Sequence, residues 1–424
     1  MVERRTPIPI EEAIERVMKY PLGGGVEAVS IEESDGRVLA KPLLATHPVP
    51  PFRKSPYDGF AFRAEDTKGA LENHPVTFRI VEHVPAGHVS TYELGRGEAV
   101  RIMTGAKIPD EATCVAMFEV CQEYVQDEEE YVSIKREMKA GQNVMEAGSE
   151  TEDGQVLVGA GKVINPGVKA LLATFGYSVV HVYKKPRIGV FATGTELIDV
   201  DAPLVDGKIR NSNASMVVSQ IKRAGGVPIY FGSLRDELHQ SYESMKVALE
   251  EVDVLITTGG VSVGDFDLLP AIYEKLGAKV LFNKVAMRPG SVTTVASVDG
   301  KLLFGLSGNP SACYAGFELF VRPIIRGGLG TSAIHPPKTL ATLKGDFGKA
   351  NPFTRFVRGK LVLQEGRVFA QPVGIDKSGV VTSLAETTIL IKLHGGTRGH
   401  QEGDVVDVLL LETDEGDPHT WTAH

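Results

Sequence analysis

From Pro186 onward the chain alternates between short apolar runs and amphipathic segments, and this alternation limits the fold more than any other feature of the sequence. The runs at residues 188–191, 227–231, 252–257, 279–285 and 302–306 are predicted to be strands, and the segments 216–223, 238–249 and 268–276 are predicted to be helices. Strands that alternate with helices usually form a largely parallel sheet covered by those helices. We therefore predict an α/β domain here.

On either side of this region the sequence has a different hydrophobic pattern, with short β-like runs and no alternating helices. After Pro48, Pro50 and Pro51, runs predicted to be strands lie at residues 76–81, 99–103, 114–120 and 131–135, separated by Gly, Pro and acidic turns. Beyond residue 326, further β-like runs lie at residues 356–363, 368–372, 389–393 and 405–411. We expect an all-β insert before the α/β region and a small barrel or sandwich after it.

Two helices are predicted outside the α/β region. Apolar residues at positions 10, 13, 14, 17 and 18 share one face of a short amphipathic helix. A second helix, over residues 168–175, has Asn165 as its N-cap, Pro166 at its first position and Gly176 just past its end.

Length, charge and cysteine content exclude several classes of protein. A chain of 424 residues is too long for one hydrophobic core, so several domains are expected. The net charge of −9, without a basic stripe, argues against nucleic acid as a partner. No apolar run reaches the roughly 18 residues of a membrane-spanning helix and no signal peptide is recognisable, so a cytoplasmic location is expected. Cys114, Cys121 and Cys313 form no C-x-x-C pair and the histidines are scattered, which indicates neither a disulfide framework nor a zinc site.

The glycine-rich turn after the strand at 252–257 is the strongest candidate for a binding site. Gly259, Gly260 and Gly264 surround Ser262 just before a predicted helix. Ligands of α/β sheets bind beyond the carboxyl ends of the strands, where such a turn offers backbone N–H groups to a phosphate or a similar oxyanion. The alternative is a tight turn that needs glycine only for its backbone angles.

Two carboxylates in the same turn indicate a cation beside that anion. Asp265 and Asp267 would repel a phosphate unless a cation lay between them, and Mg²⁺ accepts both carboxylate and phosphate oxygens as ligands. Asp265 has a structural alternative as the N-cap or a first-turn acid of the helix. Asp267 is the better candidate for metal binding.

Two further turns of this kind follow other strands of the predicted sheet. Ser307-Gly308-Asn309-Pro310 opens a predicted helix over residues 311–321, in which Asn309 is able to cap the helix and Pro310 to begin it. The turn at residues 192–197 places the carboxylate of Glu196 at a strand end. Three such turns in one sheet indicate an elongated ligand with more than one anionic group.

Several common catalytic motifs are absent. The sequence has no Walker A pattern, no G-x-G-x-x-G fingerprint and no G-x-S-x-G elbow, so an ordinary ATPase, a dinucleotide oxidoreductase and a serine hydrolase are poorly supported. Cys114 and Cys121 lie in or beside β runs and are predicted to be core residues.

Four segments match a known family when they are taken together and in order. They are Ser55-Pro56-Tyr57-Asp58-Gly59-Phe60-Ala61, Arg101-Ile102-Met103-Thr104-Gly105-Ala106, residues 258–267 and Leu306-Ser307-Gly308-Asn309-Pro310. In these segments the chain resembles the molybdopterin molybdotransferases of the MoeA type, a family that includes the C-terminal domain of gephyrin. The resemblance covers nearly the whole chain. It implies an elongated, multidomain α/β plus all-β chain that acts as a homodimer, with the active cleft between the α/β domain of one subunit and the β insert of the other.

The resemblance also implies four domains. Residues 1–45 and 147–185 would form a discontinuous helical N-terminal domain, residues 46–146 the β insert, residues 186–326 the molybdopterin-binding α/β domain with a central parallel sheet, and residues 327–424 a C-terminal β-barrel.

The implied reaction takes adenylylated molybdopterin and molybdate, cleaves the phosphoanhydride with Mg²⁺, and releases AMP. By matching motif, the catalytic residues implied are Asp58, Thr104, Glu150, Glu196, Asp236 and Asp267, and the metal ligands among them are Glu196, Asp236 and Asp267. The alternatives are a turn-forming role for Asp58, a strand-closing role for Thr104 and a solvated Arg235-Asp236 pair. Glu150 stands where the family pattern usually has Asp, so its reach is one methylene longer.

The resemblance further implies a set of substrate-binding residues. For the molybdopterin end these are Gly259, Gly260, Ser262, Gly264, Ser307, Gly308, Asn309 and Pro310, and for molybdate they are Arg288, Pro289, Arg358 and Ser378. The family's Lys-Pro-Gly-Lys-Pro segment corresponds to Arg288-Pro289-Gly290-Ser291-Val292, so one cationic donor is missing. The alternative for Arg288 and Arg358 is that they are surface cations.

Three other functions remain open at this point. The departures at Ser291 and Val292 allow a non-catalytic molybdopterin-binding or scaffold paralogue, or an enzyme that inserts tungstate. The α/β domain also resembles that of the enzyme for the preceding adenylylation step, although the flanking β domains argue against that role. Other enzymes of molybdenum cofactor biosynthesis are possible partners that deliver the substrate.

Overall fold

The computed structural model describes residues 6–234, 237–261, 268–349, 352–413, 417 and 419–421. The chain divides into two compact units. The first consists of Met1–Lys41, Ala160–Lys169 and Val179–His424, and the second of Pro42–Gly159 and Ala170–Ser178.

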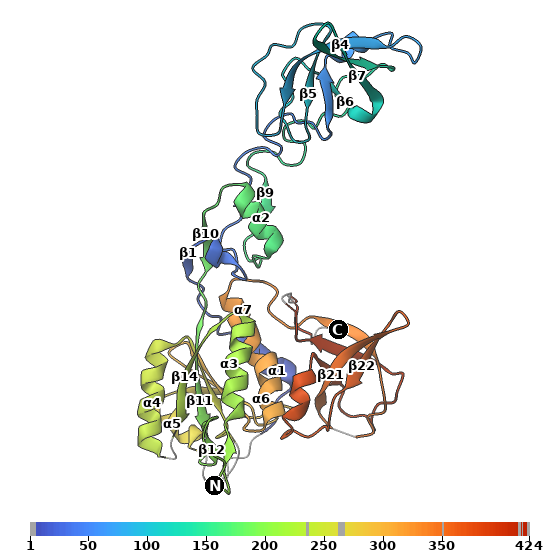
Figure 1. The fold of residues 1–424 in the computed structure, drawn as a ribbon. Helices are drawn as coiled ribbons and strands as arrows, with labels where there is room; N and C mark the ends of the chain where they lie inside the picture. Colours follow the sequence, from blue (N-terminus) through green and yellow to red (C-terminus); the bar gives the residue numbers. More distant parts are fainter. Residues whose placement is uncertain are drawn as a thin grey trace. The chain divides into compact units, whose positions relative to one another are not determined.

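A six-stranded sheet forms the centre of the first unit (Figure 1). Its strands, in spatial order, are β14 (Val227–Leu234), β11 (Arg187–Thr193), β15 (Val254–Thr258), β19 (Lys301–Leu306), β18 (Thr294–Val298) and β16 (Lys279–Phe282). The strands from β14 to β19 are parallel, whereas β18 pairs antiparallel with both β19 and β16. The predicted α/β sheet is confirmed, with an antiparallel edge that includes one strand, β18, which the sequence pattern did not reveal.

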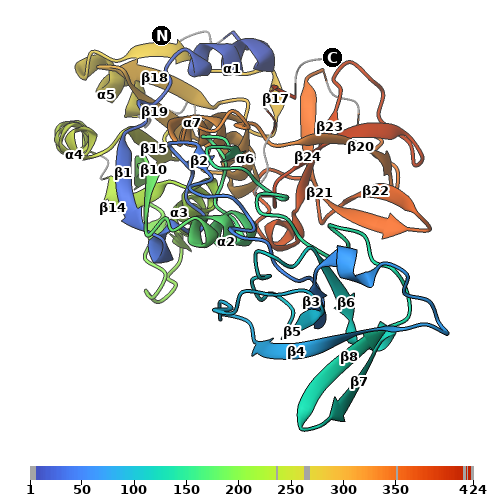
Figure 2. The same ribbon diagram turned by 90° about the horizontal axis from the view of Figure 1, so that it is seen from above.

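Helices cover both faces of this sheet. One face packs against α1 (Ile10–Met18), α3 (Ser212–Ala224), α6 (Pro310–Gly316) and α7 (Arg322–Gly328), and the other against α4 (Leu238–Glu251) and α5 (Leu269–Lys275) (Figure 2). The predicted single helix over residues 311–321 is wrong in its second half. There the backbone forms a π-helix, Phe317–Val321, whose side chains are all buried.

The C-terminal strands close into a barrel and do not form a sandwich. Their order is β21 (Thr354–Gln364), β22 (Arg367–Pro372), β20 (Lys338–Leu343), β24 (Val405–Leu410) and β23 (Ile389–Leu393), and β23 pairs back onto β21. Barrel residues such as Phe356 and Leu409 belong to the same buried cluster as Phe317 of the π-helix. The barrel and the helical layer therefore share a hydrophobic core, which fixes the position of one against the other.

Short elements complete the first unit. They are β1 (Val26–Ser30), which pairs antiparallel with β10 (Val179–Tyr183), β12 (Leu197–Ile198), which pairs parallel with β13 (Ile209–Arg210), β17 (Met287–Arg288), and the 3₁₀ helices η1 (Glu32–Ser34) and η5 (Thr382–Glu386). Helix α2 (Pro166–Thr174), whose residues are divided between the two units, begins as predicted, because the Val168 N–H donates to Asn165 Oδ1 at 2.9 Å. The division into four domains stays a prediction.

The second unit is built on its own six-stranded sheet. The spatial order is β6 (Cys114–Met117), β3 (Gly59–Phe62), β5 (Glu98–Ile102), β4 (Val76–Val84), β8 (Glu129–Ile134) and β7 (Cys121–Gln126). A two-stranded ribbon, β2 (Leu43–Leu44) with β9 (Val156–Val158), and the 3₁₀ helices η2 (Ala64–Thr67) and η3 (Phe118–Val120) accompany it. Phe60, Phe62 and Phe78 lie in its core. The all-β character of this segment is confirmed, with β3 and β7 in addition to the predicted strands.

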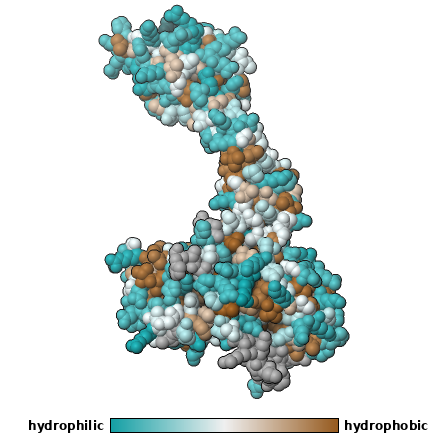
Figure 3. All heavy atoms as spheres, turned by 180° about the vertical axis from the view of Figure 1, so that it is seen from behind, coloured by the Kyte–Doolittle hydropathy of each residue, from teal (hydrophilic) through white to brown (hydrophobic). Residues whose placement is uncertain are grey.

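The described surface is mixed in character. Figure 3 shows one face, on which hydrophobic residues lie in patches between hydrophilic ones. In the part of the chain that the structure describes, no helix is long and apolar enough to cross a membrane.

Candidate active site

Three loops meet at one edge of the central sheet of the first unit. They follow β11, β15 and β19, which are neighbouring parallel strands, so their carboxyl ends lie side by side. Two hydrogen bonds join the loops: the Thr193 hydroxyl donates to Thr258 O at 3.2 Å, and the Gly259 N–H donates to Leu306 O at 2.9 Å. The three turns therefore lie side by side, at the usual place for a ligand in an α/β sheet; the elongated ligand with more than one anionic group stays a prediction.

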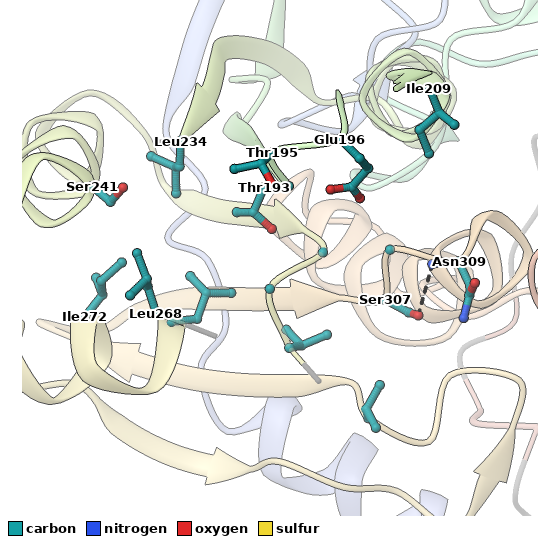
Figure 4. Close-up of a pocket in the computed structure, with 17 residues that line it drawn as sticks. Thr193, Thr195, Glu196, Ile209, Leu234, Ser241, Leu268, Ile272, Ser307 and Asn309 are labelled. Atoms are coloured by element: carbon teal, nitrogen blue, oxygen red, sulfur yellow. Dashed lines mark hydrogen bonds between the residues drawn. The ribbon is translucent and has the colours of Figure 1, made fainter. Parts of the chain in front are cut away.

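A cavity of about 540 Å³ lies over these loops (Figure 4). Its volume is within the range of about 300–1,000 Å³ that is typical of small-molecule sites. Leu234, Leu268 and Ile272 form an apolar side, whereas Glu196, Ser307 and Asn309 present oxygen and nitrogen atoms from the other side. The cavity therefore suits a ligand with both a ring system and polar groups.

Gly259 and Gly260 are required by the close approach of the first loop. Their φ angles are 92° and 66°. A Cβ atom added to Gly259 would lie 2.6 Å from Thr193 O, and one added to Gly260 would lie 2.8 Å from Thr193 Oγ1. The Gly259 N–H already donates to Leu306 O, so it is not among the N–H groups that this turn can offer to an anion. Among the described residues, nothing accepts a hydrogen bond from the Gly260 N–H. Ser262, Gly264, Asp265 and Asp267 lie outside the described residues, as does Asp236.

The Ser307-Gly308-Asn309-Pro310 turn is held by side chains on both sides of it. Ser307, only 6% exposed, accepts a hydrogen bond from the Asn309 N–H at 3.2 Å, and Gly308 O accepts one from Asn213 Nδ2 at 2.7 Å. Pro310 begins α6 as expected, but Asn309 does not cap it with its side chain. In Figure 4 that side chain lies at the cavity beside Ser307. The capping explanation for Asn309 is therefore incorrect, and its amide is available to a ligand.

Glu196 is the one predicted metal ligand among the described residues. Its carboxylate folds back over Gly194, where an added Cβ would lie 2.5 Å from Glu196 Oε2, and in Figure 4 it points into the cavity. No ion pair of this carboxylate is found within the described residues. No cluster of three or more His, Cys, Asp or Glu side chains is placed to hold a metal in that part of the chain. The other two predicted metal ligands, Asp236 and Asp267, lie outside it.

A second cavity, of about 580 Å³, contains the residues expected to bind molybdate. Arg288, Pro289, Arg358 and Ser378 all line it, together with Ser291 and Val292. Strand β17 pairs parallel with β21 and sets Arg288 beside Arg355. The two cavities share Val292, Ser307 and Asn309 in their linings, so they lie next to each other at the turn that opens α6.

Arg358 is more deeply buried than a surface cation would be, so the alternative stated for it is wrong. It is 5% exposed, and its guanidinium donates to Ile375 O at 2.7 Å, Lys377 O at 3.3 Å and Val380 O at 3.4 Å. Burial lowers the pKa of Arg358. Arg288, in contrast, is exposed at the mouth of the cavity.

Sequence reasoning missed three cations of this second cavity. Lys349, Arg355 and Lys377 also line it. They lie in no recognisable motif and are about 60 to 90 residues from Arg288 along the chain. The position of Lys377 next to Ser378 was the one local signal that pointed to any of them.

Asp58 and Thr104 lie together in the second unit. Asp58 Oδ1 accepts hydrogen bonds from the Thr104 N–H at 2.6 Å and from the Thr104 hydroxyl at 2.8 Å. These two bonds, with a smaller contribution from Arg101, lower the pKa of Asp58 below its ordinary value of 3.8. Thr104 lies beyond the end of β5, so it positions a carboxylate and does not merely close a strand. Glu150 is exposed, and no hydrogen bond links it to this pair among the described residues.

The three cysteines have no nucleophilic character. Burial raises the pKa of Cys114, Cys121 and Cys313 to about 12, so the thiols stay protonated at neutral pH. Cys114 is fully buried, as expected of a core residue, and Cys121 is half-buried.

Family models match most of the chain. The MoeA N-terminal region (domain I and II) matches residues 8–176, a probable molybdopterin binding domain matches residues 189–327, and the MoeA C-terminal region (domain IV) matches residues 341–411.

Relatives and solved structures match it from end to end. A Bacillus subtilis (strain 168) protein named molybdopterin molybdenumtransferase is 54% identical over 422 residues, which cover 100% of this chain and 98% of the relative. A protein of the same name from Staphylococcus aureus (strain COL) is 47% identical over 414 residues, 98% of each. Two crystal structures of a Pyrococcus horikoshii molybdopterin biosynthesis MoeA protein have TM-scores of 0.83 and 0.81 at 31% and 27% identity, and each match covers 96% of this chain and 100% of the other.

Proposed function

The chain belongs to the MoeA family, and from that premise we propose that it takes adenylylated molybdopterin and molybdate, joins molybdenum to the dithiolene and releases AMP. It is a transferase of molybdenum cofactor biosynthesis with a molybdopterin substrate. The release of AMP, the use of Mg²⁺ and the assembly into a homodimer are the parts that we add as proposals.

One observation carries the proposal: two adjacent cavities of different chemistry. The first combines glycine turns, an apolar wall and the Glu196 carboxylate, which has no ion pair within the described residues, and these features suit a pterin joined to a pyrophosphate. The second is rich in arginine and lysine, which suit a tetrahedral oxyanion. A substrate that spans both would bring its dithiolene end to the oxyanion and its phosphoanhydride to the carboxylates.

We propose distinct roles for the residues of the first cavity. The Gly260 N–H, Ser307 and Asn309 orient the phosphates and the ring system. Glu196, with Asp236 and Asp267, would hold Mg²⁺, and the open carboxylate of Glu196 beside a phosphate-sized cavity fits that role. The metal, when bound, would withdraw charge from the phosphate oxygens and make AMP a better leaving group.

We further propose that the protein acts in the cytoplasm as a homodimer, in which a second copy supplies Asp58, Thr104 and Glu150. The lowered pKa of Asp58 keeps it ionised at neutral pH. It would therefore act as a charged, oriented carboxylate near the phosphoanhydride and not as a proton donor. Other enzymes of the same biosynthesis would deliver the adenylylated substrate.

The test is AMP release by the purified protein. Incubation with adenylylated molybdopterin, Mg²⁺ and molybdate should release AMP in a molybdate-dependent manner. Glu196→Ala and Asp267→Ala should reduce the rate by about a hundredfold or more, because each removes a carboxylate that would hold the Mg²⁺ ion, and the charge of that ion would stabilise the transition state. Asp199→Ala, which removes a carboxylate three residues beyond Glu196 and outside the cavity lining, is the matched control and should keep full activity.

The other outcomes separate the alternative functions. Equal rates with tungstate would broaden the substrate to both oxyanions. Tight binding of the substrate without AMP release would indicate a binding or scaffold protein, and consumption of ATP by the chain alone would indicate the adenylylation step.

A further inference from the structure

The second cavity has a strong excess of positive charge. Its described lining contains five cationic side chains, Arg288, Lys349, Arg355, Arg358 and Lys377, and one carboxylate, Asp376. A cavity of this composition attracts anions. Which of the cations meets the anion depends on which of them are already engaged within the protein.

Three of the five cations are engaged. Asp376 pairs with Arg355 in a short contact, and Lys349 Nζ lies 3.6 Å from Asp376 Oδ2 and 3.2 Å from Asp376 O. The two Nη atoms of Arg358 donate to three backbone carbonyls of the loop after β22, whereas its buried Nε has no partner among the described residues. These side chains shape the cavity, and Arg288 and Lys377 are the two cations of its described lining that make no hydrogen bond or ion pair at all.

Arg288 and Lys377 have no internal partners. Within the described residues, neither side chain makes a hydrogen bond or an ion pair, and both are exposed where they line the cavity. They come from different elements, Arg288 from β17 and Lys377 from the loop between β22 and η5. The cavity therefore offers an anion one uncommitted guanidinium and one uncommitted ammonium.

The backbone that carries Lys377 is fixed although its side chain is free. Arg358 binds the carbonyl of Lys377 itself, and the next residue, Ser378, accepts a hydrogen bond from the Ser311 N–H at 3.0 Å. The Ser311 hydroxyl donates to Val380 O at 2.7 Å. Ser311 belongs to α6, the helix opened by the turn that joins the two cavities. The loop is thus anchored from both sides and presents Lys377 from a constant position.

We propose that Lys377 binds the oxyanion substrate directly, with Arg288 as the second cationic donor, and that Arg358 is a positioning residue that holds the Lys377 loop in place. The inference rests on the proposed function, since it takes that function's oxyanion as the ligand. Two uncommitted monocations match the charge of a tetrahedral dianion. The cavity should therefore prefer molybdate, and dianions of the same shape, to monoanions such as perchlorate.

The test is the binding of sodium molybdate to the full-length protein, measured by isothermal titration calorimetry. Lys377→Met should weaken binding by about tenfold or more, the loss expected for one charge-assisted hydrogen bond. Lys377→Arg should restore most of the affinity. Lys344→Met removes a positive charge from the same barrel outside the cavity lining and should bind molybdate as the unaltered protein does.

A double-mutant cycle tests the role of Arg358. Arg358→Gln should weaken molybdate binding in the unaltered protein but add little to the loss in Lys377→Met, because the two residues act through one contact. Additive losses would show that Arg358 acts independently of Lys377.

Two results overturn the inference in distinguishable ways. If molybdate binds to the unaltered protein and equally well to Lys377→Met, the role of Lys377 is wrong while the proposed function stands. If the unaltered protein binds no molybdate and releases no AMP, the proposed function fails together with the inference.

Discussion

At the scale of single residues, the pairing of Asp58 with Thr104 shows how a local contact sets the charge of an exposed carboxylate. Both donors to Asp58 Oδ1 come from Thr104, one from its backbone and one from its hydroxyl. Since both bonds favour the ionised form, they lower the pKa although the carboxylate is open to solvent. The motif residues were recognisable in the sequence, but this contact between positions 46 apart was not.

Thr104→Val should raise the pKa of Asp58 toward its ordinary value of 3.8, because the hydroxyl donor is lost while the backbone donor remains. The folded-state pKa lies below the unfolded one, so the contribution of this group to stability is present above the unfolded pKa and is lost as the pH falls through the folded pKa. Carbon-13 NMR titration of the Asp58 carboxyl measures the shift. Thr104→Ser keeps the hydroxyl and should titrate as the unaltered protein does. An unchanged pKa in Thr104→Val would mean that the backbone bond alone sets the charge.

The cations of the second cavity show where sequence reasoning stops at this scale. Arg288, Arg358 and Ser378 were identified by motif, and all three line one cavity. Lys377 belongs to no motif, and its importance depends on which neighbouring charges are already paired. That information exists only in three dimensions, because Asp376 is adjacent in sequence to Lys377 but pairs with Arg355 and Lys349.

At the scale of elements, two strands that the sequence analysis missed, β18 and β3, differ in whether a local sequence signal could have revealed them. Strand β18 is joined to β19 by Asp299-Gly300, whose φ angles of 49° and 80° fit a two-residue hairpin turn. An Asp-Gly pair is a strong hairpin signal in a sequence. Strand β3, in contrast, is buried on both faces, so it has no alternation of polar and apolar residues to reveal it. The first omission was avoidable from sequence and the second was not.

The turn after β15 requires glycine at position 259, and a substitution there tests this requirement. Gly259→Ala should distort the first cavity, because its Cβ would lie 2.6 Å from Thr193 O at a φ of 92°. We expect a loss of AMP release of at least tenfold and a destabilisation of about 1–3 kcal/mol, the usual cost of a strained backbone position. Urea denaturation and the AMP assay measure the two effects.

Gly300→Ala is the control for backbone strain alone. Gly300 also has a positive φ, of 80°, but nothing lies within 4 Å of its added Cβ. It should lose stability and keep its activity. Equal activity in both variants would show that the Gly259 turn does not shape the site.

At the scale of the whole molecule, the fold class and the order of an all-β insert, an α/β region and a C-terminal β region were predictable, because each follows from hydrophobic periodicity. The joining of the helical layer to the barrel was not predictable. Besides the shared hydrophobic core, it involves a buried ion-pair network around Glu318, which is 0% exposed and pairs with Arg223 and Arg322. Arg322 also donates to Leu411 O at 3.1 Å and Thr413 O at 3.3 Å, at the end of the barrel.

Glu318→Ala should be strongly destabilising, by about 3–5 kcal/mol, because it leaves the guanidinium of Arg322 buried without its counter-charge. Urea denaturation followed by circular dichroism measures the free energy of unfolding. Glu386→Ala removes an exposed partner of Lys360 in the same barrel and should change that free energy little. A small effect in Glu318→Ala, similar to that of the control, would show that the network does not hold the helical layer and the barrel together.

The proposed function places the two ends of one reaction in the two adjacent cavities. A crystal structure of the protein soaked with AMP, Mg²⁺ and molybdate tests it most directly. We expect the phosphate of AMP beside Gly260 and Glu196, and molybdate between Arg288 and Lys377, on either side of the Ser307–Asn309 turn. Molybdate or AMP bound elsewhere in the molecule, with both cavities empty, would rule out this placement.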